Sequence, residues 1–141
     1  VVGDLEGEGE IDKPLKKDEF SGRVSIAPIS QGGKTALTRY KALERAGEYT
    51  LVECELVTGR THQIRVHLAS IGHPIVGDEK YGDFQDCRKM KKLHGLENQF
   101  LHAYKLGFGQ LSGILSPLSG KEFVCPLPKD ESDLIASLKS E

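Results

Sequence analysis

Four side chains that can bind anions or carry protons lie within six positions of one another. They are Arg60, His62, Gln63 and Arg65, in the segment TGRTHQIRVH at residues 58–67. An arginine binds a carboxylate or phosphate through two parallel hydrogen bonds, and it is costly to bury without such a partner. Two interpretations of Arg65 stay open: a stabilising ion pair with a nearby acid, Glu53 or Asp78, or a clamp for a catalytic carboxylate or a phosphate.

The sequence before this segment predicts a strand and a tight turn. Residues 49–57 alternate in polarity, so Val52 and Cys54 are expected on one face of a strand. Gly59 is expected to let the backbone turn without a steric clash. Thr61 is expected to cap the helix that follows, by accepting hydrogen bonds from its free N–H groups.

A helix is predicted over residues 61–71. Ile64, Leu68 and Ile71 follow at positions i, i+4 and i+7, which is one apolar stripe. Gly72 is expected to end the helix in a left-handed conformation. The start of this helix carries Arg60, His62 and Arg65, and the free N–H groups there favour anions.

The remaining segments predict an α+β domain. We expect strands over residues 23–29, 34–43, 100–108, 113–115 and 122–126, a terminal helix over 132–139, and irregular or loop structure over 6–12, 14–18 and 83–98. The predicted fold is therefore a mixed, mainly antiparallel sheet with one central helix and a C-terminal helix. Residues 1–141 are expected to form a single unit.

Composition limits the classes of function. The chain has 141 residues, of which 38% are hydrophobic, and a net charge of −2, as expected for one soluble globular domain or part of a larger one. No apolar run reaches membrane-spanning length. Nucleic-acid binding would have to rest on a local basic patch. Three widely spaced cysteines, Cys54, Cys87 and Cys125, indicate reduced thiols and a cytoplasmic location.

Other chemistries lack their motifs. His62 and His67 are five positions apart instead of four, and no Cys-x-x-Cys occurs, so we expect no metal site. No Gly-x-Ser-x-Gly motif or complete P-loop is present. The basic residues 88–92 fit either contact with an RNA backbone or a solvated loop face. Nearby, Tyr81 and Phe84 fit either base stacking or local packing.

The central segment resembles the RluA family of RNA pseudouridine synthases. The residues that carry the resemblance are 58–68, followed by GHPIVGD at 72–78 and Tyr81-Gly82, with further matches at 9–15, 33–40 and 99–103. The resemblance implies a mixed, mainly antiparallel sheet crossed by an active cleft. It also implies a cofactor-free isomerase that converts uridine to pseudouridine in ribosomal or transfer RNA.

The family's catalytic aspartate and tyrosine have no counterpart in this sequence. The aspartate belongs to a His-Arg-Leu-Asp type motif and the tyrosine to a Lys-x-Tyr segment, both of which precede the segments matched here. The resemblance therefore implies that residues 1–141 are the C-terminal portion of a catalytic domain, inactive without the upstream half. Arg65 matches the arginine that pairs with the catalytic aspartate, and Leu101 is expected in the pocket floor.

RNA is the expected partner, and no cofactor or membrane is expected. The expected RNA-binding residues are Arg60, His62, Gln63, Lys80, Arg88, Lys89, Lys91 and Lys92. Two alternatives stay open, a non-catalytic RNA-binding module derived from the same fold and an inert structural fragment. A half-sheet would also expose an unpaired strand edge, which predicts self-association of the chain.

Overall fold

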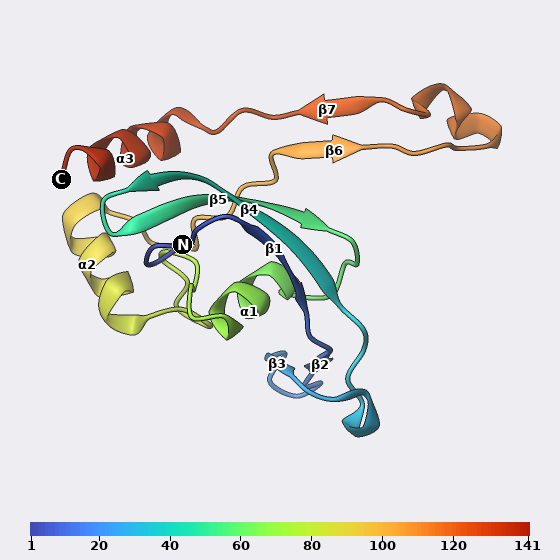
Figure 1. The fold of residues 1–141 in the computed structure, drawn as a ribbon, viewed down its shortest axis with the longest axis horizontal. Coiled ribbons are helices and arrows are strands. Elements are labelled where there is room, and N and C mark those ends of the chain that lie inside the picture. The colour runs from blue at the N-terminus through green and yellow to red at the C-terminus, as the bar shows by residue number, and fades with distance from the viewer.

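The computed structural model describes residues 1–141 as an α+β fold built around one antiparallel sheet (Figure 1). The elements of the main body are β1 (Glu8–Asp12), β2 (Leu15–Lys17), β3 (Val24–Ile26), η1 (Ile29–Gln31), β4 (Leu37–Ala46), β5 (Tyr49–Leu56), α1 (Gln63–Ser70) and α2 (Phe84–His94). The C-terminal elements are β6 (Lys105–Gly107), η2 (Gly113–Leu118), β7 (Glu122–Val124) and α3 (Lys129–Lys139). All strand pairs are antiparallel, which confirms the predicted fold class.

The main sheet has the strand order β1-β4-β5. A tight turn at Gly47, with a φ of 62°, connects β4 to β5, and a register shift between Ala42 and Glu44 interrupts their ladder. The sequence prediction of residues 34–43 as a strand leading into a turn is confirmed, although β4 begins and ends three residues later. This sheet is the platform on which α1 lies.

Two segments predicted as loop and connector are strands. Residues 8–12 form β1, which pairs with β4, and residues 15–17 form β2, which pairs with β3. The sequence of β1 does not resemble a strand, since it begins with Glu8, Gly9 and Glu10. An edge strand is held by backbone hydrogen bonds and needs few apolar side chains. The predicted strand at 23–29 is shorter than expected, since it ends at Ile26 and is followed by η1.

Helix α1 is confirmed with a shorter span than predicted, from Gln63 to Ser70. Leu68 packs with Leu5, Ile11 and Ile75, and the partly buried Ile64 and Ile71 line the same cluster. A second face of α1 buries Val66 against Leu15, Val24 and Ala36. The helix therefore joins the main sheet to the β2–β3 hairpin, and its packing on both sides fixes the direction of its N-terminal residues.

The expectation of a loop over residues 83–98 is wrong. Residues 84–94 form α2, which Asp83 caps by accepting from the N–H of Asp86. Cys87 and Met90 are its only buried residues, so the apolar stripe is too narrow to be recognised among the lysines. Met90 is fully buried with Tyr49, Val76 and other core residues.

The C-terminal third of the chain extends away from the main body, and its elements differ most from the predicted ones. β6 and β7 form a two-stranded ribbon that projects beyond the main sheet before the chain returns to α3 (Figure 1). Most of residues 100–108 are irregular, residues 113–115 lie in η2 instead of a strand, and α3 starts three residues earlier than predicted. No helix combines the length and apolar character needed to cross a membrane.

Candidate functional site

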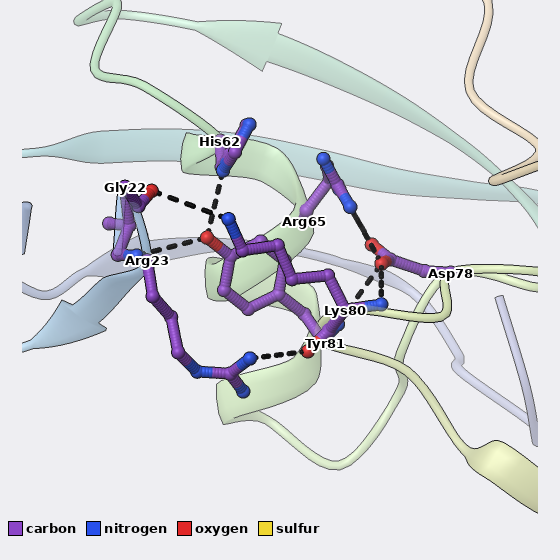
Figure 2. Close-up of polar contacts among 8 residues, drawn as sticks. Gly22, Arg23, His62, Arg65, Asp78, Lys80 and Tyr81 are labelled. Carbon is purple, nitrogen blue, oxygen red and sulfur yellow. Dashed lines mark hydrogen bonds and ion pairs between the residues drawn. The ribbon is translucent and has the colours of Figure 1, made fainter. Parts of the chain in front are cut away.

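Arg65 forms a bidentate ion pair with Asp78 (Figure 2). Its Nε lies 2.8 Å from Oδ2 of Asp78, and its Nη2 lies 2.8 Å from Oδ1. The side chain of Arg65 is 14% exposed and that of Asp78 is 1% exposed. Of the two acids considered from the sequence, the structure therefore has Asp78, and not Glu53, as the partner of Arg65.

Asp78 is held in place by the loop that follows it. Its Oδ1 also accepts hydrogen bonds from the backbone N–H groups of Lys80 and Tyr81, both at 3.0 Å. Burial opposes ionisation of this carboxyl group, but the hydrogen bonds from Arg65 and the two amides outweigh it and hold its pKa below the ordinary value. Asp78 is therefore a charged anchor for Arg65.

Tyr81 lies against the other side of the arginine. Its ring centroid is 4.9 Å from the guanidinium carbon of Arg65, a cation–π distance. Arg65 donates from Nε and Nη2 to Asp78, while no protein atom accepts a hydrogen bond from Nη1. The hydrogen bond to Asp78 raises the pKa of Arg65, so the guanidinium stays charged with one donor nitrogen available to a further acceptor.

His62 contacts the same tyrosine from the start of α1. Its Nδ1 lies 2.8 Å from the Tyr81 hydroxyl, which also accepts a hydrogen bond from the N–H of Val24 at 2.9 Å. His62 has a φ of 53°, which is unusual for a residue other than glycine and marks a constrained position. Burial, and then the positive charge of Arg65, lower the pKa of His62, so the neutral imidazole is favoured here.

The predicted cap at Thr61 is wrong. His62 occupies the N-cap position, and no side chain caps the helix there. The side chain of Gln63 instead folds back, and its Oε1 accepts from the N–H of Arg60 and from the hydroxyl of Thr58, both at 2.9 Å. Gly59 is also not needed for the turn, since it lacks a positive φ and a Cβ there would meet no atom within 4 Å.

A buried polar chain supports the start of α1 from below. Gln63 donates to the hydroxyl of Thr38 at 3.0 Å, and that hydroxyl lies 2.8 Å from Nδ1 of His67. Nε2 of His67 lies 2.8 Å from the carbonyl oxygen of Lys13, which can only accept, so this nitrogen carries the proton. The direction of each hydrogen bond in this series is therefore fixed, and the series orients Gln63 and α1.

This network gives Gln63 a structural role that its sequence context does not indicate. Gln63 is 2% exposed, and its amide also donates to the carbonyl oxygen of Leu37. Both ends of the side chain are therefore hydrogen-bonded inside the protein, which favours a structural role for Gln63, and the expectation that it binds RNA stays a prediction. Arg60 is exposed instead, with its Nε donating to the carbonyl oxygen of Thr35 at 2.9 Å.

The basic run expected to bind RNA lies on α2, away from the Arg65 cluster (Figure 1). Two of its lysines are engaged by acids, Lys89 by Glu48 at 2.6 Å and Lys91 by Glu97 at 3.5 Å. Arg88 lies over the exposed ring of Phe84, 5.8 Å from its centroid. Only Lys80 among the expected lysines joins the site, where its Nζ lies 5.7 Å from the centroid of Tyr81.

Two residues of interest escaped the sequence analysis, and one expected residue remains apart. Arg23 donates from Nη1 to the carbonyl oxygen of Lys80 at 2.8 Å and lies over the Tyr81 ring, although 57 positions separate the two bonded residues. Thr38 lies within the predicted strand 34–43, and no local pattern distinguishes it from the other residues of that strand. Leu101 is 43% exposed between α2 and β6, so its place in a pocket floor stays a prediction.

Comparison with known proteins agrees with these motifs. A family model described as RNA pseudouridylate synthase matches residues 1–70. An uncharacterized RNA pseudouridine synthase of Bacillus subtilis (strain 168), YlyB, is 42% identical over 134 residues, which cover 94% of this chain and 39% of the relative. Ribosomal large subunit pseudouridine synthase C of Escherichia coli (strain K12) is 42% identical over 114 residues, or 77% of this chain and 36% of the relative.

Solved structures show the same relationship. Human RNA Pseudouridylate Synthase Domain Containing 1 has a TM-score of 0.66 and 27% identity, covering 99% of this chain and 63% of that one. Human RNA Pseudouridylate Synthase Domain Containing 4 has a TM-score of 0.64 and 29% identity, covering 94% and 57%. The chain spans about two fifths of the length of the curated relatives it matches. Its sequence and fold together show that it belongs to the RluA family of RNA pseudouridine synthases.

Proposed function

We propose that residues 1–141 are the arginine-bearing portion of an RNA pseudouridine synthase, which isomerises uridine to pseudouridine in ribosomal or transfer RNA. The relatives support the reaction class, since they carry the names of pseudouridine synthases. The observation that carries the proposal is the state of Arg65, which is charged, nearly buried and hydrogen-bonded to Asp78 through two of its three nitrogens.

Arg65 has the geometry of a clamp for a second carboxylate. Asp78 fixes Nε and Nη2, so the position of the remaining nitrogen is set before any further partner arrives. Tyr81 lies against the guanidinium and limits its rotation. An arginine with a preformed orientation can position a nucleophilic carboxylate and stabilise its charge without reorganising.

The nucleophile itself comes from another segment of the parent protein. Asp78 is the aspartate nearest Arg65, but it is 1% exposed and its oxygens accept four hydrogen bonds. A carboxylate in that state cannot approach a uridine. The aspartate and tyrosine that the family resemblance implies therefore lie outside residues 1–141, and the isolated chain is inactive as an isomerase.

A tritium-release assay tests this proposal. RNA labelled at uridine C5 loses its tritium when pseudouridine forms, because C5 becomes the site of the new glycosidic bond. We expect release by the chain extended with its upstream coding sequence and none by residues 1–141 alone. Release by residues 1–141 alone would mean that one of their own residues is the nucleophile, and the proposed division of the active site would be wrong.

One observation favours a second candidate, a non-catalytic RNA-binding module. Arg65 already has a complete carboxylate partner in Asp78, so the pair is stable without a catalytic aspartate. Under this alternative, the extended chain would also fail to release tritium but would still bind RNA in a filter-binding titration.

The working location and partners follow from the same proposal. RNA modification by bacterial relatives supports a cytoplasmic setting, and the three cysteines form no disulfide. The chemistry proposed for Arg65 needs no metal or organic cofactor, since a carboxylate and a charged arginine suffice. Under this proposal, residues 1–141 pack against the upstream portion of the same catalytic domain, in addition to binding RNA.

A further inference from the structure

His62 is the only residue other than glycine that has a positive φ. Its φ of 53° and ψ of 23° place it in the left-handed region at the N-cap of α1, and its side chain caps no N–H group of the helix. This conformation is unfavourable for a residue with a Cβ, and it persists where surrounding contacts hold the residue in place. The contacts of His62 therefore determine what its side chain can do.

The hydroxyl group of Tyr81 determines which nitrogen of His62 carries a proton. This hydroxyl accepts the N–H of Val24 at 2.9 Å and lies 2.8 Å from Nδ1 of His62. The backbone N–H can only donate, so the single proton of the hydroxyl is directed at Nδ1. The opposite tautomer would leave the hydroxyl proton without an acceptor. Nδ1 of His62 is therefore unprotonated, and Nε2 carries the proton.

The surroundings of His62 favour this neutral form over the imidazolium ion. Burial is the main cause that lowers the pKa of His62, followed by the positive charges of Arg65 and Lys80. Lys17 lowers the pKa further, and Asp78 opposes the shift. His62 is therefore a neutral hydrogen-bond donor, which retains its proton when it binds an acceptor.

The donor of His62 is a neighbour of Arg65 at the start of α1. Three positions separate the two residues, and both lie against the Tyr81 ring (Figure 2). The ring centroids of His62 and Tyr81 are 5.4 Å apart, and the guanidinium carbon of Arg65 is 4.9 Å from the Tyr81 centroid. No protein atom accepts a hydrogen bond from Nε2 of His62 or from Nη1 of Arg65. Two unpaired donors are therefore oriented by one tyrosine.

Isomerisation of uridine creates negative charge that such a donor stabilises. Cleavage of the bond between C1′ of the ribose and N1 of the base leaves the bonding electrons on the base, where the two carbonyl oxygens share the charge. The base then turns, C5 forms a bond to C1′ and loses its proton, and N1 gains a proton. A neutral N–H directed at a carbonyl oxygen stabilises the detached base and keeps it in the site, whereas an imidazolium ion would protonate it.

We propose that His62 donates from Nε2 to a carbonyl oxygen of the target uracil, and that Tyr81 is the positioning residue that fixes the tautomer of His62. The inference rests on the proposed function, because it takes the isomerisation of uridine as the reaction. Tyr81 then orients two groups. Its ring lies against Arg65, which faces the nucleophilic carboxylate, and its hydroxyl holds His62, which faces the base. The two donors are one helical turn apart, so they reach the ribose side and the base side of one nucleotide.

Nitrogen NMR of the histidine rings tests the tautomer on residues 1–141 without RNA. Protonated and unprotonated ring nitrogens have separate chemical shifts, and the His62 signals are assigned by their loss in His62→Gln. We expect a protonated Nε2 and an unprotonated Nδ1 near neutral pH. Tyr81→Phe keeps the aromatic ring but removes the hydroxyl, so it should give a mixture of the two tautomers. A protonated Nδ1 in the unaltered chain would overturn the inference.

The rate of tritium release by the extended chain tests the contact with the base. His62→Asn should lower kcat by about 100-fold or more, because its amide reaches only the position of Nδ1. His62→Gln retains an N–H near the position of Nε2, so its kcat should stay within about tenfold of the wild type.

Tyr81→Phe should lower kcat by about 10-fold to 100-fold and change KM by less than about twofold, because it misplaces a donor without removing a contact to RNA. Tyr49→Phe is the matched control. It removes a hydroxyl that donates to Asp86 at 2.7 Å, outside the site, and should leave kcat unchanged. In the His62→Gln background, Tyr81→Phe should have little further effect, since an amide has no tautomer to fix.

The outcomes separate this inference from the proposed isomerase. A loss of kcat in Tyr81→Phe that disappears in the His62→Gln background supports the role of Tyr81. Equal activity of His62→Asn and His62→Gln, or an equal effect of Tyr81→Phe in both backgrounds, would overturn it, while tritium release by the extended chain would still support the isomerase. Failure of the unaltered extended chain to release tritium would overturn the proposed function and the contact with uracil, but not the tautomer that NMR measures.

Discussion

At the scale of single residues, the rest of the site depends on the ion pair between Arg65 and Asp78. Asp78→Ala should destabilise the fold by about 3–5 kcal/mol, because it leaves a nearly buried guanidinium without its counterion. Chemical denaturation measures the loss. Glu79→Gln is the control, since Glu79 is exposed and makes no ion pair, and it should change stability by less than about 0.5 kcal/mol. Similar stability of the two variants would mean that the pair contributes little.

His67 should make the stability of the protein depend on pH. Burial is the main cause that lowers the pKa of His67 from the ordinary value of 6.5, and the charge of Lys13 adds to it, against opposing contributions from Asp12 and a hydrogen bond to the Lys13 carbonyl. Below about pH 6.5 the unfolded chain then binds more protons than the folded one, so unfolding becomes easier as pH falls. The stabilising effect is complete above pH 6.5 and is lost as pH drops toward the folded pKa.

Denaturation at several pH values between about 7.5 and 5 measures this effect. His67→Gln should lose less stability over that range than the wild type, because the titrating imidazole is gone. His62 also has a pKa lowered mainly by burial, so it contributes to the part of the slope that remains. An unchanged slope in His67→Gln would contradict the role given to the buried histidine.

At the scale of elements, the loop 78–82 decides where Arg65 points. Gly82 permits this loop to close, because a Cβ there would collide with the carbonyl oxygen of Asp78. Gly82→Ala should therefore force the backbone to move, destabilise the fold by about 1–3 kcal/mol and disturb the Arg65 pair. Gly59→Ala is the matched control, since a Cβ at Gly59 meets no atom within 4 Å. Thermal unfolding compares the two variants, and equal melting temperatures would refute the constraint.

The elements also show how far the sequence could be interpreted. The apolar positions Ile64, Leu68 and Ile71 and the alternation of β5 predicted α1 and β5, because these side chains pack against the core. β1 was missed because its pairing depends on backbone groups, and α2 because only Cys87 and Met90 face inward. A local pattern of apolar residues arises because one face of an element is buried. The pattern is therefore weak in elements that bury few side chains.

The sequence indicated only part of the candidate site. The segment 58–67 and Asp78 were found, because arginine near a buried stripe requires an anion and few acids were close in sequence. The choice between Glu53 and Asp78 was not determined, since it depends on how the loop 78–82 folds back on α1. Arg23 was not found, because its contact with Lys80 bridges two segments that no local pattern relates.

The whole molecule has a small core and an exposed C-terminal arm. Only 22 of 141 residues are buried, and large apolar side chains are exposed along the segment 101–124, among them Leu106, Ile114, Phe123 and Val124. Figure 1 shows β6 and β7 extending away from the main sheet, and β5 forms one edge of that sheet. Exposed apolar ribbons and unpaired strand edges favour association with other chains.

We therefore expect residues 1–141 to self-associate when purified alone. Size-exclusion chromatography with light scattering should give a mass above 15.5 kDa that rises with concentration. The variant Leu106→Lys/Phe123→Lys, which charges the ribbon, should move the mass toward that of a monomer. A monomer at all concentrations for the unaltered chain would count against this expectation.

The central claim is that Arg65 serves catalysis beyond its structural pair with Asp78. The most direct test is the rate of tritium release by the extended chain with Arg65→Lys and Arg65→Ala, normalised to the folded fraction, with RNA affinity measured on the same samples. The account predicts a fall in rate of about 100-fold or more in both variants, with RNA affinity largely unchanged, because only the arginine fork can hold both carboxylates. A rate close to that of the wild type, in variants shown to be folded, would contradict it and leave Arg65 as a structural residue.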